Sequence, residues 1–133
     1  MKIIYTVAVS VVCSISAQAA IPAEIEDAFL RYIQLARELE PILAAAQDQE
    51  TADAHARALY DILPRVYEAR TELMKIEKLS PQVQAELVQK YGKAMQTAWG
   101  KVYEQIFRLE KCNCYHSLSY FKQFRALCMM LQQ

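Results

Sequence analysis

The chain has 133 residues with 15 basic and 15 acidic side chains, so its formal net charge is zero. A chain of this length forms one domain with a single core of modest size, and a balanced charge argues against binding to nucleic acid. With two glycines and four prolines, the composition also argues against turn-rich β folds and against glycine-rich phosphate-binding loops.

The first twenty residues have the pattern of an export signal. Met1 and Lys2 precede an almost unbroken apolar run from Ile3 to Ile15, and Ala17 and Ala19 match the small-x-small cleavage rule. We therefore expect export to the periplasm or the extracellular space, with cleavage after Ala19 and a single domain over residues 20–133. The alternative is an N-terminal membrane anchor or a buried first helix, but about 13 apolar residues are short for the roughly 20 that span a bilayer.

The segment 22–46 predicts a first helix that begins at Pro22, a residue suited to the first helical position. Pro41 lacks the N–H that would bond to Arg37, so the helix either kinks there or restarts as a last turn over residues 42–46. Its apolar residues recur at spacings of four and three, which places them on one face; they are Ile25, Phe29, Tyr32, Ala36, Leu39 and Leu43.

The segment 51–79 predicts a second helix, preceded by a polar turn over residues 48–50. Thr51 is the expected N-cap, and Pro64 is expected to bend the helix without ending it, because the apolar stripe continues in phase past it. The stripe consists of Ala52, Leu59, Ile62, Val66, Ala69, Leu73 and Ile76.

Ser80 and Pro81 are the expected N-cap and first position of a third helix, which should run to about Lys111. Gly92 and Gly100 lie inside it and predict close approach of another helix. Its stripe comprises Val83, Leu87, Tyr91, Met95, Ala98, Val102, Ile106 and Leu109. After a break over residues 113–116, Ser117 can cap a short fourth helix that carries Leu118, Phe121, Phe124, Leu127 and Cys128.

These elements predict an all-α fold, an antiparallel up-down-up bundle of three long helices with a short C-terminal fourth helix that covers one end. The expected core consists of Ile25, Phe29, Tyr32, Leu39, Leu59, Ile62, Val66, Leu73, Leu87, Tyr91, Val102 and Ile106.

Three segments together resemble a group of small exported all-helical bacterial proteins of unassigned function. They are Asp48 to Ala54, then Leu79 to Pro81 with the Lys90-Tyr91-Gly92 motif and Glu104 to Leu109, and finally Asn113 to Tyr115 before a short helix. The resemblance covers most of the mature chain and implies the fold and export. Its motifs are helix caps and packing residues, so it implies no activity, and His116 stands where a small residue or glycine is expected.

The only dense cluster of reactive residues lies near the C-terminus and contains Cys112, Cys114, His116 and Cys128. These are candidate ligands of a soft-metal site for Cu(I) or zinc. In the alternative that we favour, Cys128 fills an apolar helix face and the C-x-C pair is incidental or disulfide-bonded. We therefore predict no stoichiometric metal and no cofactor.

The three cysteines of the mature chain predict one disulfide and one remaining thiol in an oxidising compartment. A helix over residues 117–130 would place Cys128 roughly 16–20 Å along its axis, whereas a disulfide needs Cα atoms within about 7 Å. We therefore predict that at least one of Cys112, Cys114 and Cys128 lacks an intramolecular partner.

The remaining candidates for chemistry are weaker. His55 is expected to bond to a backbone group, because no serine or cysteine stands at a spacing that indicates a nucleophile beside it. Five acid-to-base pairs four residues apart indicate solvated helix faces: Asp27–Arg31, Asp53–Arg57, Asp61–Arg65, Glu86–Lys90 and Glu104–Arg108. Five tyrosines at helical spacing are expected at the edges of the buried seam, although a ligand groove between helices would use the same residue type; they are Tyr32, Tyr60, Tyr67, Tyr91 and Tyr103.

With no catalytic constellation, the sequence favours a non-enzymatic role in binding a protein or assembling with a second copy. Nucleic acid is not an expected partner, and a membrane is expected to contact the chain only through the signal segment before cleavage. The alternative is a periplasmic stress- or metal-responsive protein, either a chaperone that holds unfolded clients or a soft-metal binder. It is indicated by a faint similarity of residues 79–84 to the Leu-Thr-x-x-Gln repeat of such chaperones.

Overall fold

The computed structural model describes residues 21–132, except for the side chain of Glu77. The predicted signal segment, residues 1–19, lies outside this range. The described residues form four α-helices, α2 (Ala23–Ala44), α3 (Gln49–Met74), α4 (Pro81–Lys111) and α5 (Leu118–Gln132), with short 3₁₀ segments η1 (Lys75–Lys78) and η2 (Asn113–His116). The all-α prediction is confirmed. None of the helices between residues 21 and 132 is long and apolar enough to cross a membrane.

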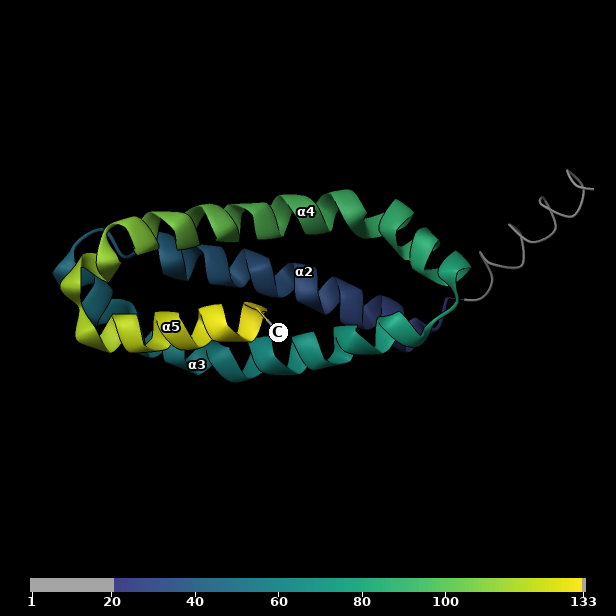
Figure 1. Ribbon diagram of the computed structural model, residues 1–133, viewed down its shortest axis with the longest axis horizontal. Coiled ribbons are helices and arrows are strands. Elements are labelled where there is room, and N and C mark those ends of the chain that lie inside the picture. Colours follow the sequence, from purple (N-terminus) through teal and green to yellow (C-terminus); the bar gives the residue numbers. More distant parts are fainter. Residues whose placement is uncertain (1–20, 133) are drawn as a thin grey trace, which may run out of the picture.

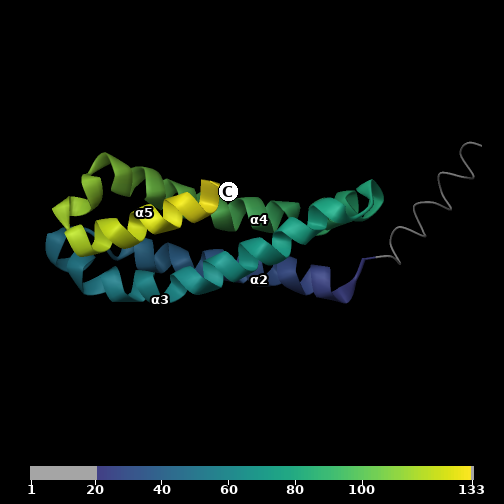
Figure 2. The same cartoon turned by 60° about the horizontal axis from the view of Figure 1, so that its bottom comes forward.

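The helices run up and down along one elongated bundle (Figure 1). The helix α2 packs against both α3 and α4, and α5 packs against α3. With 15 residues against 31, α5 spans about 22 Å and α4 about 46 Å at 1.5 Å per residue. The helix α5 therefore ends half-way along the bundle, and at the other end no further helix of residues 21–132 lies between α4 and the α3–η1 segment (Figure 2).

The first helix differs from its prediction by one residue. Pro22 has extended backbone angles and is the N-cap, so α2 begins at Ala23. The carbonyl of Pro22 accepts hydrogen bonds from the amides of Ile25 and Glu26. Pro41 does not interrupt the helix, which continues to Ala44, so neither the kink nor the restart is needed to carry the chain past it.

The expected N-cap of the second helix is wrong, because Asp48 caps α3 and Thr51 lies in its first turn. The carboxylate of Asp48 accepts from the amide of Thr51 at 2.8 Å, and the hydroxyl of Thr51 accepts from the amide of Asp48 at 3.0 Å. Together they form a capping box that satisfies two amides of the helix start. The residues assigned to a polar turn are therefore the cap and first turn of α3. At its other end α3 stops at Met74 and tightens into η1.

The third and fourth helices begin where the sequence predicts. The Ser80 hydroxyl accepts from the amide of Val83 at 3.4 Å, and α4 runs to Lys111. In η2 four consecutive residues, 113–116, have positive φ angles between 51° and 62°, a region that non-glycine residues rarely occupy. This left-handed turn reverses the chain, and the Ser117 hydroxyl then accepts from the amide of Tyr120 at 3.3 Å at the start of α5.

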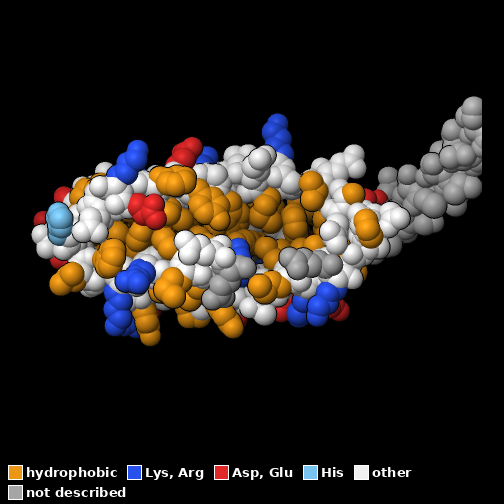
Figure 3. All heavy atoms as spheres, viewed as in Figure 1, with side chains coloured by type: hydrophobic (Ala, Val, Ile, Leu, Met, Phe, Trp, Pro, Cys, Tyr) orange, Lys and Arg blue, Asp and Glu red, His pale blue; other side chains and the backbone are white. Residues whose placement is uncertain are grey.

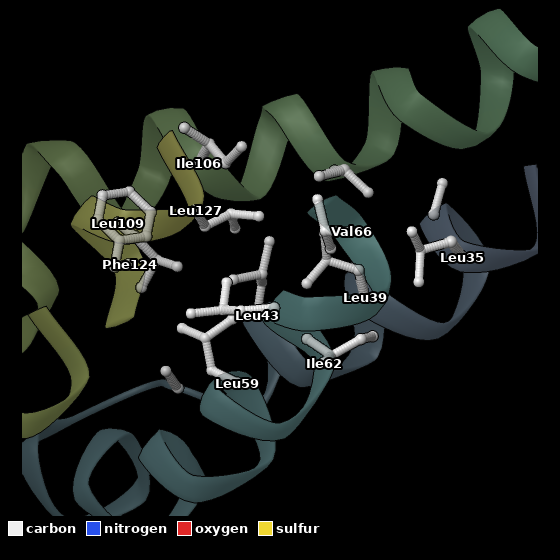
Figure 4. Close-up of a cluster of buried hydrophobic side chains, with 14 of the residues drawn as sticks. Leu35, Leu39, Leu43, Leu59, Ile62, Val66, Ile106, Leu109, Phe124 and Leu127 are labelled. Carbon is white, nitrogen blue, oxygen red and sulfur yellow. The ribbon is translucent and has the colours of Figure 1, made fainter. Parts of the chain in front are cut away.

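The core lies at the end of the bundle where all four helices meet, and Figure 4 shows its centre. Each helix contributes to it: Leu35, Leu39 and Leu43 from α2, Leu59, Ile62 and Val66 from α3, Ile106 and Leu109 from α4, and Phe124 and Leu127 from α5. Eight of the twelve predicted core residues are buried: Tyr32, Leu39, Leu59, Ile62, Val66, Leu87, Val102 and Ile106.

The other four predicted core residues, Ile25, Phe29, Leu73 and Tyr91, are only partly buried. They belong to the start of α2, the end of α3 and the first part of α4, which is the end that α5 does not reach. A stripe of apolar residues is buried only where a neighbouring helix covers it. Leu87 of the same end is fully buried, whereas Phe29, Leu73 and Tyr91 pack against the buried cluster from its edge, so this end is covered only in part.

The fourth-helix stripe is also partly wrong. Leu118 is 84% exposed and Phe121 is 38% exposed, whereas Tyr120 is completely buried. The left-handed turn of η2 sets the rotation of α5, and that rotation turns Tyr120, Phe124 and Leu127 towards the core.

Candidate functional site

The structure places the four candidate metal ligands around the α4–α5 turn in different environments. Cys114 is fully buried, Cys112 and Cys128 are half-buried, and His116 is exposed. No disulfide joins the three cysteines. Within residues 21–132 no three side chains of His, Cys, Asp or Glu gather where they could hold a metal ion together.

Burial decides the chemistry of the Cys114 thiol. Removal from water raises its pKa to about 12, and the neighbouring thiols of Cys112 and Cys128 act in the same direction. A thiol with so high a pKa carries almost no thiolate near neutral pH, and the thiolate is the form that ligates metals and attacks electrophiles. Cys114 is therefore a packing residue of the turn.

His55 has the backbone partner that the sequence predicts. Its Nδ1 lies 2.8 Å from the carbonyl oxygen of Thr51, one turn earlier in α3. The nearby carboxylate of Asp53 accepts hydrogen bonds from the hydroxyls of Ser117 and Ser119. Asp53 thus ties α3 to the start of α5, and this arrangement connects helices without preparing a nucleophile.

None of the five expected acid-to-base pairs is among the four ion pairs of the described residues, of which two are local and two join different helices. Lys90 instead pairs with Glu26 of α2 at 2.9 Å, and the Tyr91 hydroxyl donates to the same carboxylate. This hydrogen bond from Tyr91, followed by that from Lys90, lowers the pKa of Glu26.

Arg108 of α4 links the end of α2 to the turn before α5. Its guanidinium donates to the carbonyl oxygens of Leu43 and Ala46, both at 2.9 Å, and to the Tyr115 hydroxyl at 2.8 Å. Because the last carbonyls of a helix have no partner within it, Arg108 satisfies the C-terminal end of α2 while anchoring the turn before α5.

An apolar groove of about 820 Å³ lies beside α4, at the end of the bundle that α5 leaves open. We call it the open groove, and its lining consists of Phe29, Tyr32, Leu73, Ile76, Val88, Gly92, Lys93, Met95, Gln96, Trp99 and Tyr103. Figure 3 shows apolar side chains in a band between α4 and α3 that continues past the C-terminal end of α5. Val88 on its wall is 63% exposed.

An aromatic pair fixes the inner surface of the open groove. The rings of Tyr32 and Trp99 have centroids 4.3 Å apart, and the Trp99 indole N–H donates to the carbonyl oxygen of Tyr32 at 3.2 Å. Arg70 approaches from α3, and its Nη1 lies 3.5 Å from the Tyr32 hydroxyl. Burial raises the pKa of Tyr32 and the guanidinium of Arg70 opposes that rise, so the phenol stays neutral and available as a hydrogen-bonding group.

Gly92 widens the groove. A Cβ atom at this position would lie 3.2 Å from Cγ1 of Val88 on the same helix, whereas a Cβ at Gly100 would meet nothing within 4 Å. Neither glycine lies against another helix, so the expectation of close helix approach is wrong.

Sequence reasoning noticed Tyr32 and Tyr103 but did not assemble the groove. The missing signal was the set of apolar residues on α4 beside the predicted stripe, namely Val88, Trp99, Tyr103 and Phe107. They widen the apolar face of α4, and a wider face needs a second neighbour, which the described residues do not supply along the first half of α4.

Comparison with family models, with curated proteins and with solved structures found no match for this chain.

Proposed function

We propose that this protein is exported and acts without catalysis, by holding a helix of a protein partner in the open groove. The observation that carries the proposal is the groove itself, a hollow of about 820 Å³ with a mainly apolar lining that comes from three helices of the described residues. Large exposed apolar surfaces of this kind mark interaction sites in folded proteins.

The shape of the groove favours a helix as its occupant. Tyr103 lines both the open groove and the smaller hollow that the C-terminal residues Leu131 and Gln132 help to form. The open groove therefore begins where α5 ends and continues along α4 in the same direction. From Val88 to Tyr103 it follows α4 for about 22 Å at 1.5 Å per residue, which matches about fifteen residues of a helix laid beside it.

The lining favours binding over chemistry. Among the lining side chains that the structure describes, Lys93 is the only charged one. The other polar groups are the tyrosine hydroxyls, the Trp99 indole and the Gln96 amide, and these described side chains include no carboxylate, imidazole or thiol. His55 and His116 lie elsewhere in the fold. Aromatic and aliphatic anchors with few polar groups are the usual composition of a helix-binding groove. Export rests on the pattern of residues 1–19.

Site-specific photo-crosslinking in the producing cell tests the proposal. A benzoylphenylalanine in place of Val88 should crosslink to a segment of another protein with apolar residues at i, i+3 or i+4, and i+7. The crosslink should disappear when Gly92→Leu fills the groove and persist with Gly100→Leu, whose side chain enters open space. The same probe at the exposed Tyr60, outside the groove, is the matched control. No groove-dependent crosslink to a protein would reject the proposal.

A second candidate is a chaperone that holds unfolded clients, favoured by large apolar side chains that are exposed outside the groove, such as Tyr67, Phe107 and Met129. Such a protein would crosslink equally from Val88 and Tyr60, to extended segments of many proteins. It would also suppress aggregation of a denatured client, and Gly92→Leu would leave that activity unchanged.

A further inference from the structure

The open groove carries positive charge among its apolar residues. Among the lining side chains that the structure describes, Lys93 is the one charged residue. It is exposed and takes part in no ion pair with the described side chains. Arg70 reaches the groove through the Tyr32 hydroxyl and likewise has no carboxylate partner among those side chains.

Cations without an ion pair also occur elsewhere among the described residues, for example Arg31 and Lys101, so Lys93 and Arg70 are distinguished by their place beside an apolar groove. Two cations without a carboxylate therefore flank the groove, Lys93 from α4 and Arg70 from α3. Burial of these two cations by an occupant without an opposite charge would cost the free energy of their desolvation. A carboxylate between the apolar residues of the occupant would offset that cost.

We infer that the occupant of the open groove is an acidic amphipathic helix of another protein, whose apolar face carries an Asp or Glu that pairs with Lys93 and Arg70. The inference rests on the proposed function. Charge complementarity also disfavours a second copy of this chain as the occupant, because the exposed apolar side of its own α5 includes Lys122 and Arg125 beside Leu118 and Phe121. Placing that face in the groove would bring like charges together.

Trp99 is the single tryptophan of the chain and lines the groove, so its emission reports occupancy directly. The probes are synthetic 18-residue amphipathic helices without tryptophan. They are identical except for one residue at the centre of the apolar face, which is Glu, Gln or Lys. We expect the Glu peptide to bind five- to ten-fold more tightly than the Gln peptide in 20 mM salt, and the Lys peptide to bind least. The Glu advantage should shrink in 300 mM salt, where the Debye length is about 6 Å.

Protein variants then assign the preference to the two cations. The double variant Lys93→Gln with Arg70→Gln should bind Glu and Gln peptides alike. The matched control Lys101→Gln, a lysine of α4 outside the groove lining, should keep the preference. Because the peptide series is compared on the unmodified protein, the inference stays testable even if the double variant is unstable.

The outcomes separate the two proposals. Equal binding of the Glu, Gln and Lys peptides, or a Glu preference that survives in the double variant, would overturn the acidic partner and leave the helix-binding groove intact. Failure of all three peptides to bind at millimolar concentration would reject the groove as a helix site. A dimer in sedimentation velocity that the Glu peptide dissociates would show that a second copy occupies the groove, and would also overturn the inference.

Discussion

Removing the Tyr120 hydroxyl should make this protein more stable. Tyr120 is completely buried at the start of α5, and its hydroxyl has no hydrogen-bond partner among the described residues. Burial raises the pKa of its phenol well above the ordinary value, so the group is neutral. A buried hydroxyl without a partner costs roughly 1–3 kcal/mol of desolvation in protein mutational data.

Phenylalanine keeps the ring and its packing and removes only the oxygen. We therefore expect Tyr120→Phe to raise the free energy of unfolding by about 1–2 kcal/mol. With a urea m-value of roughly 2 kcal/mol/M, the midpoint should rise by about 0.5–1 M. Urea titration followed by Trp99 fluorescence and by far-UV circular dichroism measures this shift.

Two comparisons isolate the hydroxyl. Tyr67→Phe alters a side chain that is 57% exposed and should change stability by less than about 0.5 kcal/mol. Tyr120→Ala removes the ring as well and should cost about 3–5 kcal/mol, as other aromatic truncations in cores do. A loss of stability in Tyr120→Phe would refute the reasoning, because it would mean that the hydroxyl makes a favourable hydrogen bond.

Other substitutions test the packing of the two ends and the thiols. Leu39→Ala removes a completely buried side chain and should cost about 2–5 kcal/mol, whereas Leu73→Ala, at the half-buried end, should cost less than half of that in the same urea titration. Gly100→Ala should stabilise α4 by about 1 kcal/mol, and Gly92→Ala should stabilise it less, because its Cβ would lie 3.2 Å from a neighbouring side chain. In native alkylation followed by mass spectrometry, Cys114 should react most slowly of the three cysteines that lie in the described residues, since its pKa is about 12; labelling of Cys114 first would contradict its burial.

The spacing of apolar residues and the positions of capping residues were enough to predict the helices. Spacings of three and four residues identify a helix wherever a face is buried, and the Ser80–Pro81 pair marks the start of α4 without ambiguity. Where two capping residues stand close together, as Asp48 and Thr51 do, the sequence does not say which is the cap, because each can accept from the other's amide. The error at Thr51 is therefore a local choice between two chemically equivalent arrangements.

The spacing of residues along the sequence could not predict which side chains of different helices pair with one another. An (i, i+4) rule sees only neighbours on the same helix, whereas Glu26 bonds to residues 64 and 65 positions away, Lys90 and Tyr91. Arg108 likewise bonds to Leu43 and Ala46 across the bundle. The contacts of Arg108 also satisfy carbonyl oxygens at the end of α2, which the local pair with Glu104 could not do.

The predicted core residues that are only half-buried lie at the same end of the bundle as the open groove. Phe29 and Leu73 belong to well-formed apolar stripes, yet they line the groove instead of a closed core because α5 ends half-way along the bundle. An occupant that covered them would stabilise this end by mass action, by RT ln(1 + [L]/Kd). Binding of an occupant should therefore stabilise the fold around Phe29 and Leu73. The region around Leu39, which is already completely buried, should gain little stability from any occupant. Hydrogen exchange with and without the Glu peptide distinguishes the two ends, because protection should rise around residues 73 and 92 and stay unchanged around residue 39.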